Sequence, residues 1–303
     1  MNQFYELESI VKGINPNQDY SPFIEKELNY IYLKNTSDLF LEAYKLVESG
    51  KKKNILIGPA NGFTNSLVVN YILGLTTIDP IKYGLVPEFF FGMEYPFFNV
   101  NLSQPLIISN PTNFQINSLS VLEKYSRLST AIDYNFHSEK LHDVDFLELN
   151  FSDSLHLKCF EQEIGVLKIL DENDLINSIA ISHVGLKSFH LSRILHNENC
   201  MFEEFTETNG ILLFQEQWLR LVSRFAAKNI DESIEIKKSI CKDKIRFQAF
   251  LDLFKNSNLG IETVKYLFDI IRLLPSKAHS VGEAHIISSI LNLPKQNEQH
   301  YEY

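Results

Sequence analysis

Residues 58–75 read GPANGFTNSLVVNYILGL and follow a short apolar run at 54–57. Apolar residues then recur with helical spacing from Leu67 to Ile72. This order predicts a strand, a tight glycine turn and a helix. A glycine turn before a helix offers free backbone N–H groups, so Gly58, Gly62 and Ser66 are candidate phosphate ligands. The stretch matches neither GxGxxG nor the Walker pattern, and an ordinary tight turn remains the alternative.

The segments on either side of this turn differ in pattern. Residues 23–49 have helical spacing, and Gly50 is predicted to end that helix. Residues 85–170 are richer in Phe, Val, Ile and Thr, which indicates strands. Helical patterns follow at 214–228, 231–241, 245–255, 261–273 and 281–291. The sequence therefore predicts an α/β half and an all-helical half, with a boundary near 186–205 and a polar tail after Pro294.

The composition excludes several classes of protein. The 303 residues are 45% hydrophobic and 22% charged, which excludes disorder and small disulfide-rich folds. The net charge of −10 indicates that any nucleic-acid binding is local and weak. No signal peptide and no apolar run of about 20 residues is found, so we expect a cytoplasmic protein without membrane contact. Cys159, Cys200 and Cys241 are isolated, and no metal site is predicted from them.

A longer segment carries a more specific signal. Residues 58–90, GPANGFTNSLVVNYILGLTTIDPIKYGLVPEFF, resemble the signature of the C-family bacterial replicative DNA polymerase, the α subunit of DNA polymerase III. Three further segments resemble blocks of that family in the same order: ISHVGLKSF at 181–189, GILLFQEQ at 210–217 and PSKAHSVGEAH at 275–285. The resemblance implies a Pol β-like nucleotidyltransferase palm over 1–195, followed by a helical fingers-like domain over 196–303.

The same resemblance implies that the catalytic carboxylates are missing. Polymerases hold two divalent cations with carboxylates on a rigid strand. The family carries them on a Pro-Asp-Phe-Asp-type strand and on the Asp of an Asp-Phe-Leu-Gly-Leu block, where this chain has Ser182. For the strand there are two candidate alignments: the nearer in sequence has Asn99 and Asn101, and the other has Asp143 and Asp145. The family's arginine and serine are also absent from the glycine turn. We therefore expect no catalytic residue, no bound metal and no cofactor.

Two other functions remain open from the sequence. Asp143 and Asp145 would share one face of a strand, and a divergent nucleotidyltransferase could use them to bind Mg²⁺. A solvent-exposed strand face explains their alternation equally well. Alternatively, the protein could bind a nucleotide without turnover, through the glycine turn with Gln215, Lys277 and His279. The competing interpretation is that residues 215–217 brace helices and that Lys277 and His279 begin the last one.

The preferred interpretation is a catalytically inactive pseudo-polymerase that acts as an accessory or interaction subunit in DNA replication, repair or defence. The phosphoesterase domain of the full α subunit has no room in this chain, so surfaces that it covers would need another partner. The aromatic segment 87–98 and the apolar run 105–109 are the predicted contacts of a homodimer or hetero-complex.

Overall fold

The computed structural model describes most of the chain with gaps. The described residues are 2–15, 18–93, 96–104, 113–118, 172–182, 205–208, 210–226 and 229–291. Asp143, Asp145, Cys159, Cys200, the run 105–109, the predicted boundary near 186–205 and the tail after Pro294 lie outside these ranges. The predictions on them therefore stay predictions.

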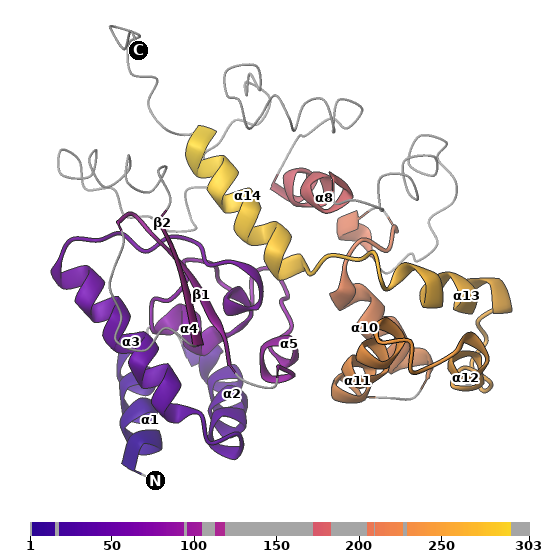
Figure 1. Ribbon diagram of the computed structural model, residues 1–303, viewed down its shortest axis with the longest axis horizontal. Coiled ribbons are helices and arrows are strands. Elements are labelled where there is room, and N and C mark those ends of the chain that lie inside the picture. The colour runs from indigo at the N-terminus through magenta and orange to yellow at the C-terminus, as the bar shows by residue number, and fades with distance from the viewer. Residues whose placement is uncertain are drawn as a thin grey trace, which may run out of the picture.

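The amino-terminal part begins with helices that pack beside a small sheet (Figure 1). These are α1 (Asn2–Ile14), the short η1 (Gln18–Tyr20), α2 (Ser21–Leu33) and α3 (Ser37–Lys52). The predicted single helix over 23–49 is wrong, because Asn35 adopts a left-handed conformation with φ 52° and separates α2 from α3. Asparagine tolerates that conformation better than most residues do, so it can end a helix.

Gly50 does not end α3, contrary to the prediction. The helix continues to Lys52, and the chain turns at Asn54, which has φ 55°. Gly50 is buried, and a Cβ atom there would lie 3.9 Å from the side chains of Ile55 and Ile57. This is ordinary van der Waals contact, so Gly50 neither ends the helix nor is required for the packing of the returning chain.

The predicted strand at 54–57 is a turn residue, Asn54, followed by chain at 55–57 that lies along β1 (Phe98–Leu102). Ile57 forms one antiparallel bridge with Leu102, and the N–H of Ser103 donates to the carbonyl of Leu56 at 2.9 Å. On its other side, β1 pairs in parallel with β2 (Phe114–Ser118), with Phe98 opposite Phe114. Together with the helices, this two-stranded sheet gives the α/β character that the sequence predicts.

Most of the described phenylalanines in the aromatic segment 87–98 lie in the protein's own core. Residues Glu88–Phe91 form the helix α5 and not a strand. Phe90 is 1% exposed and Phe98 is 0% exposed, and their rings lie 5.4 Å apart. The sequence-based argument that these phenylalanines form a surface contact is therefore wrong, because the protein's own α/β core already covers them. Phe97 is the exception, at 39% exposed.

The helical part confirms four predicted helices. They are α10 (Gln215–Phe225), α11 (Ile230–Cys241), α12 (Phe247–Asp252) and α13 (Ile261–Ile270). Trp218 is fully buried among them, stacks on Phe250 and donates its indole N–H to the carbonyl of Leu267 at 2.8 Å. The short η6 (Thr206–Thr208) precedes α10. In the described part of the chain, no helix is both long and apolar enough to cross a membrane.

The last helix, α14 (Lys277–Leu291), joins the two parts of the molecule. It begins before the predicted residue 281 and packs against both α8 (Glu172–Ser182) and the glycine turn (Figure 1). A Cβ atom at Gly282 would lie only 2.7 Å from the carbonyl oxygen of Ala60. The glycine is therefore needed for the close approach of α14 to the turn.

Candidate functional site

Four asparagines gather where the glycine turn meets the sheet, and we refer to Asn61, Asn99, Asn101 and Asn117 as the amide cluster. The period-two rule places Asn99 and Asn101 on one face of β1, and Asn117 lies opposite Asn101 on β2. The Nδ2 atom of Asn117 donates to the Oδ1 atoms of Asn99 at 2.7 Å and Asn101 at 2.9 Å. The parallel register therefore brings the three amides together.

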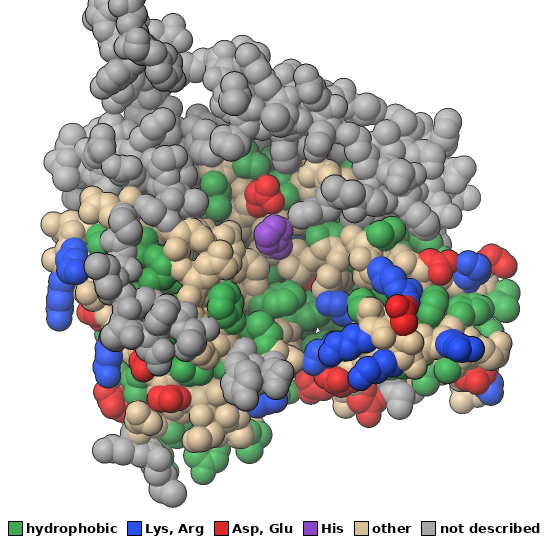
Figure 2. Space-filling model, viewed as in Figure 1, with side chains coloured by type: hydrophobic (Ala, Val, Ile, Leu, Met, Phe, Trp, Pro, Cys, Tyr) green, Lys and Arg blue, Asp and Glu red, His purple; other side chains and the backbone are tan. Residues whose placement is uncertain are grey.

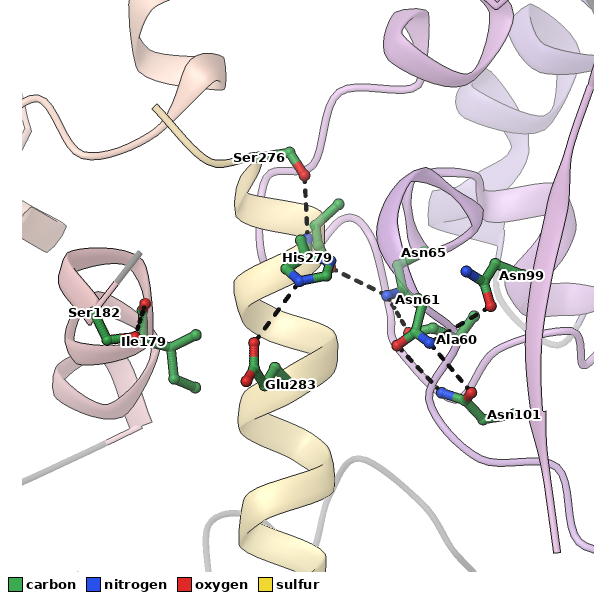
Figure 3. Close-up of polar contacts among 11 residues, drawn as sticks. Ala60, Asn61, Asn65, Asn99, Asn101, Ile179, Ser182, Ser276, His279 and Glu283 are labelled. Carbon is green, nitrogen blue, oxygen red and sulfur yellow. Dashed lines mark hydrogen bonds and ion pairs between the residues drawn. The ribbon is translucent and has the colours of Figure 1, made fainter. Parts of the chain in front are cut away.

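Asn61 completes the cluster from the glycine turn (Figure 3). Its Nδ2 atom lies 3.3 Å from the Oδ1 atom of Asn101 and 3.5 Å from that of Asn99. Asn101, which is fully buried, donates to the carbonyl of Pro59 at 2.7 Å. Because an amide both donates and accepts, the four side chains satisfy one another without a cation, which carboxylates could not do.

The first backbone N–H groups of the glycine turn donate hydrogen bonds to acceptors within the protein. The N–H of Gly58 donates to the carbonyl of Asn101, and that of Asn61 donates to the carbonyl of Asn99, both at 3.0 Å. The N–H of Ala60 points to the hydroxyl of Thr76 at 3.3 Å. These three N–H groups therefore have acceptors within the protein, while phosphate binding by Gly58, Gly62 and Ser66 stays a prediction.

Asn65 connects the turn to α14. This residue lies in η2 (Gly62–Ser66), which leads into α4 (Val68–Ile72). Its buried side chain accepts from the hydroxyl of Thr76 at 2.6 Å and donates to the carbonyls of Ala60 at 2.7 Å and Ala278 at 3.1 Å. Ser66 is also buried, and within the described ranges its hydroxyl has no hydrogen-bond partner. Asn65 was not identified from the sequence, because nothing in a local pattern shows a contact 213 positions away.

Gly62 and His279 line the same pocket. The pocket has a volume of about 470 Å³ and is lined by Gly62, Phe63, Leu273, Leu274, Pro275, Ser276 and His279. Gly62 has φ 58°, which favours glycine. The Nε2 atom of His279 lies 3.8 Å from Glu283 on the same helix. The structure thus brings the glycine turn and the start of α14 together around an open cavity.

Gln215 and Gln217 brace the helical part. Gln215 donates to the carbonyl of Leu274 at 2.6 Å and accepts from the ammonium of Lys237. The Oε1 atom of Gln217 accepts from the N–H groups of Leu213 at 2.8 Å and Phe214 at 3.0 Å. These contacts favour the bracing interpretation, while a nucleotide contact of Gln215 stays a prediction.

Glu216 holds the start of α14. Its buried carboxylate accepts from the backbone N–H of Lys277 at 2.8 and 2.9 Å and from that of Ala278 at 3.4 Å. Burial raises the pKa of Glu216, while these N–H groups and the nearby Lys237 oppose the shift. Burial also lowers the pKa of the Lys277 ammonium, which lies 5.9 Å from the centre of the Phe214 ring. Lys277 therefore lies at a helix start that is fixed by a buried acid.

A second buried acid has the same role at α4. Glu27 on α2 accepts from the N–H groups of Val68 at 3.0 Å and Val69 at 2.8 Å. Burial raises the pKa of Glu27 to about 8, and the two N–H groups act in the opposite direction. A Glu within an amphipathic helix gives no sequence signal for such a contact, and Glu27 was therefore missed.

Ser182 does not join the amide cluster. It ends α8, and its hydroxyl donates to the carbonyl of Ile179 at 2.7 Å. Figure 3 shows α14 between Ser182 and the cluster. The resemblance implied one metal position at Ser182 and two at Asn99 and Asn101, and only the latter two come together here. Within the described ranges, no group of three or more His, Cys, Asp and Glu could hold a metal ion.

A third set of buried polar side chains links α14 to α8, and it was also not identified from the sequence. The hydroxyl of Tyr83 lies 2.8 Å from the Nε2 atom of His285 and donates to the carboxylate of Glu172. Glu172 in turn lies 3.3 Å from the ammonium of Lys82. Burial and the positive charge of Lys82 lower the pKa of His285 to about 3, so this histidine is neutral in the folded protein.

Comparison with known proteins shows that this chain is similar to members of one family. The family model for the bacterial DNA polymerase III alpha NTPase domain matches residues 4–102. An alignment of 390 positions with DNA polymerase III subunit alpha of Thermotoga maritima is 22% identical and covers 92% of this chain and 46% of the relative. The subunits of the same name in Staphylococcus aureus strains Mu50 and N315 are 36% identical over 80 residues, which is 25% of this chain and 7% of theirs.

These matches confirm the resemblance inferred from the sequence. The matched region 4–102 ends with β1 and includes the glycine turn, Asn99 and Asn101. The chain spans less than half of the length of the relatives that it matches. Activities and partners of those longer proteins therefore come to this chain only as proposals.

Proposed function

We propose that this chain, a DNA polymerase III alpha-like protein, is a non-catalytic subunit that binds other components of a DNA-handling assembly rather than transferring nucleotides itself. The amide cluster is the observation that carries this proposal. Asn99 and Asn101 occupy positions where the resemblance implies metal-binding carboxylates, and Asn61 and Asn117 are hydrogen-bonded to both.

The chemistry of the cluster supports the absence of a metal centre there. Mg²⁺ in polymerases is held by carboxylates, whose negative charge offsets the cost of dehydrating the cation. Neutral amides supply no such charge, and the Oδ1 atoms of Asn99 and Asn101 already accept from Asn117. Metal binding would have to break these hydrogen bonds, which makes it unfavourable.

Thermal unfolding with and without Mg²⁺ or Mn²⁺ tests this proposal. A ligand present at 100 times its dissociation constant stabilises a protein by about 2.7 kcal/mol, so even modest binding would raise the melting temperature. We expect no metal-dependent rise and no primer extension or terminal transfer. Extension by the wild-type chain in Mn²⁺ that Asp145→Asn abolishes would overturn the proposal and establish the divergent enzyme instead.

The pocket beside Gly62 favours a second candidate, nucleotide binding without turnover. Phe63 and His279 line this pocket, and Lys277 begins the helix on which His279 lies. Calorimetric titration with a deoxynucleoside triphosphate in the absence of metal tests this candidate. His279→Ala should weaken binding, whereas Lys244→Ala, which removes an exposed cation outside the pocket lining, should not. Equal binding by both variants would exclude the pocket as the site.

A further inference from the structure

A groove on the helical part lies apart from the amide cluster and from the pocket beside Gly62. We call it the α11 groove, since α11 supplies most of its charged residues. Its volume is about 790 Å³, and it lies between the end of α5 and the helices α11 and α12. Its lining is Lys34, Phe91, Gly92, Met93, Asp231, Glu232, Ile234, Glu235, Ile236, Lys238, Ile245, Ala249 and Leu253.

Contacts between distant elements hold the α11 groove open. The ring of Phe91 stacks on Tyr30 with their centres 4.9 Å apart, and the Tyr30 hydroxyl donates to Asp231 at 3.0 Å. The ammonium of Lys238 donates to the carbonyl of Gly92 and to the carboxylate of Glu235, each at 2.7 Å. The end of α5 is thus fixed to α11, and the groove exists without a ligand.

The groove combines an apolar floor with an acidic edge. The floor consists of the side chains of Phe91, Met93, Ile234, Ile236, Ile245 and Leu253. Asp231, Glu232 and Glu235 are exposed along the first turns of α11. Figure 2 shows acidic side chains gathered at the lower edge of the region where Figure 1 places α11, with Lys and Arg side chains above them.

The charges at the edge of the groove favour a basic peptide over a nucleic acid. Lys34 and Lys238 are the basic residues of the groove lining, and Lys238 already contacts Glu235 and Gly92. Three carboxylates therefore face two ammonium groups. A nucleic acid would bring phosphates against these carboxylates, which is repulsive, whereas a basic peptide would be attracted.

The helical walls of the groove favour a partner that is itself helical. Helix α11 satisfies most of the backbone groups in its middle internally, and the carbonyl of Gly92 after α5 already accepts from Lys238. An extended peptide would find few backbone partners over the apolar floor, whereas a helix satisfies its own backbone groups. We propose that the α11 groove binds an amphipathic helix of a partner protein, with apolar side chains on the floor and Lys or Arg against Asp231, Glu232 and Glu235.

Fluorescence anisotropy with two synthetic peptides tests this proposal. The probe is a labelled amphipathic helix of about four turns, with Leu at i, i+3, i+4 and i+7 and Lys at the flanking positions. The matched peptide carries Glu instead of Lys. We expect the Lys peptide to bind about tenfold more tightly or better. Equal affinities for the two peptides would overturn the proposed charge selection.

Variants of the protein distinguish binding of the Lys peptide in the groove from a general attraction between a basic peptide and an acidic protein. Ala249→Trp fills the groove at an exposed position without changing the charge and should abolish binding of the Lys peptide. Gln248→Trp places the same side chain on α12 at an exposed position outside the lining and should leave binding intact. Glu232→Lys should weaken binding about tenfold. Unchanged binding by Ala249→Trp would overturn the proposal.

The test also distinguishes failure of this inference from failure of the proposed function. Peptide binding does not depend on nucleotide chemistry, so a wild-type chain that extends primers would overturn the non-catalytic proposal and leave the groove result standing. Conversely, loss of peptide selectivity removes the groove as a docking site and leaves the argument from the amide cluster unaffected.

Discussion

The polar side chains on the two sides of the glycine turn differ in kind. Where the turn meets β1, the four members of the amide cluster are neutral and satisfy one another. Where α4 and α14 begin, Glu27 and Glu216 place carboxylates against backbone N–H groups. The difference teaches that this fold keeps a buried acid where helix N–H groups stabilise it, and has amides where a side chain must also donate, as Asn101 does to the carbonyl of Pro59.

Introducing carboxylates into the amide cluster tests this difference directly, and it should have the largest effect on the free energy of unfolding. The double variant Asn99→Asp with Asn101→Asp should lose about 3–5 kcal/mol of unfolding free energy at neutral pH, because it brings two like charges together and sets a carboxylate oxygen at residue 101 against the carbonyl of Pro59. The loss should shrink at acidic pH as the new carboxyl groups are protonated. Chemical denaturation at several pH values measures both effects.

Asn29→Asp is the matched control for that variant, since it adds a carboxylate at an exposed position on α2, outside the amide cluster. It should change stability by no more than about 0.5 kcal/mol. A double variant that remains stable and gains further stability from Mg²⁺ would contradict the comparison. That result would show that the fold still accepts a metal centre at β1.

Adding a side chain where α14 approaches the glycine turn should have the next largest effect on the free energy of unfolding. Gly282→Ala would place a Cβ atom 2.7 Å from the carbonyl oxygen of Ala60 and 2.8 Å from the Nδ2 atom of Asn65. We expect a loss of about 1–3 kcal/mol, since the backbone of the turn must move. Gly13→Ala in α1 is the control, because nothing lies within 4 Å of the added atom, and it should be neutral or stabilising. Similar losses for both variants would contradict the packing argument.

The buried acid at α4 should make stability depend on pH. The pKa of Glu27 is about 8 in the folded protein and about 4.5 without the fold, so the folded state binds more protons between these values. Its contribution is therefore complete below pH 4.5 and falls as pH rises towards 8. Glu27→Gln should remove this slope and cost about 1–2 kcal/mol at acidic pH, because one acceptor oxygen becomes a donor. A variant with the same pH slope as the wild type would contradict the assignment to Glu27.

His285 should also make stability depend on pH, but in the opposite direction and at lower pH. Its pKa is about 3 in the folded protein against 6.5 without the fold, so the unfolded state binds more protons between these values. Stability should therefore fall as pH decreases from 6.5 towards 3. His285→Gln should reduce this acid sensitivity, whereas His279→Gln, at an exposed position of the same helix, should retain it. Urea denaturation between pH 4 and 7 measures the two slopes, and equal slopes in both variants would contradict the role of His285.

The sequence predicts the helical part better than the strand-rich part. Trp218 and Phe250 belong to regular apolar patterns, and the helices that carry them appear as expected. The segment 88–91 is a short helix, although its phenylalanines favour strands, because tertiary packing around Phe98 outweighs that preference. Short apolar runs do not distinguish a strand from a buried helical turn.

The sequence by itself determined four helices of the carboxy-terminal part, the glycine turn before a helix, and the amide side chains at Asn99 and Asn101. The tertiary structure alone decided that Asn61 and Asn117 join those amides, that Glu27 and Glu216 meet the starts of other helices, and that α14 contacts the turn. The physical reason is that periodicity reports which face of an element is apolar. It carries no information about which distant polar group will satisfy a buried donor or acceptor.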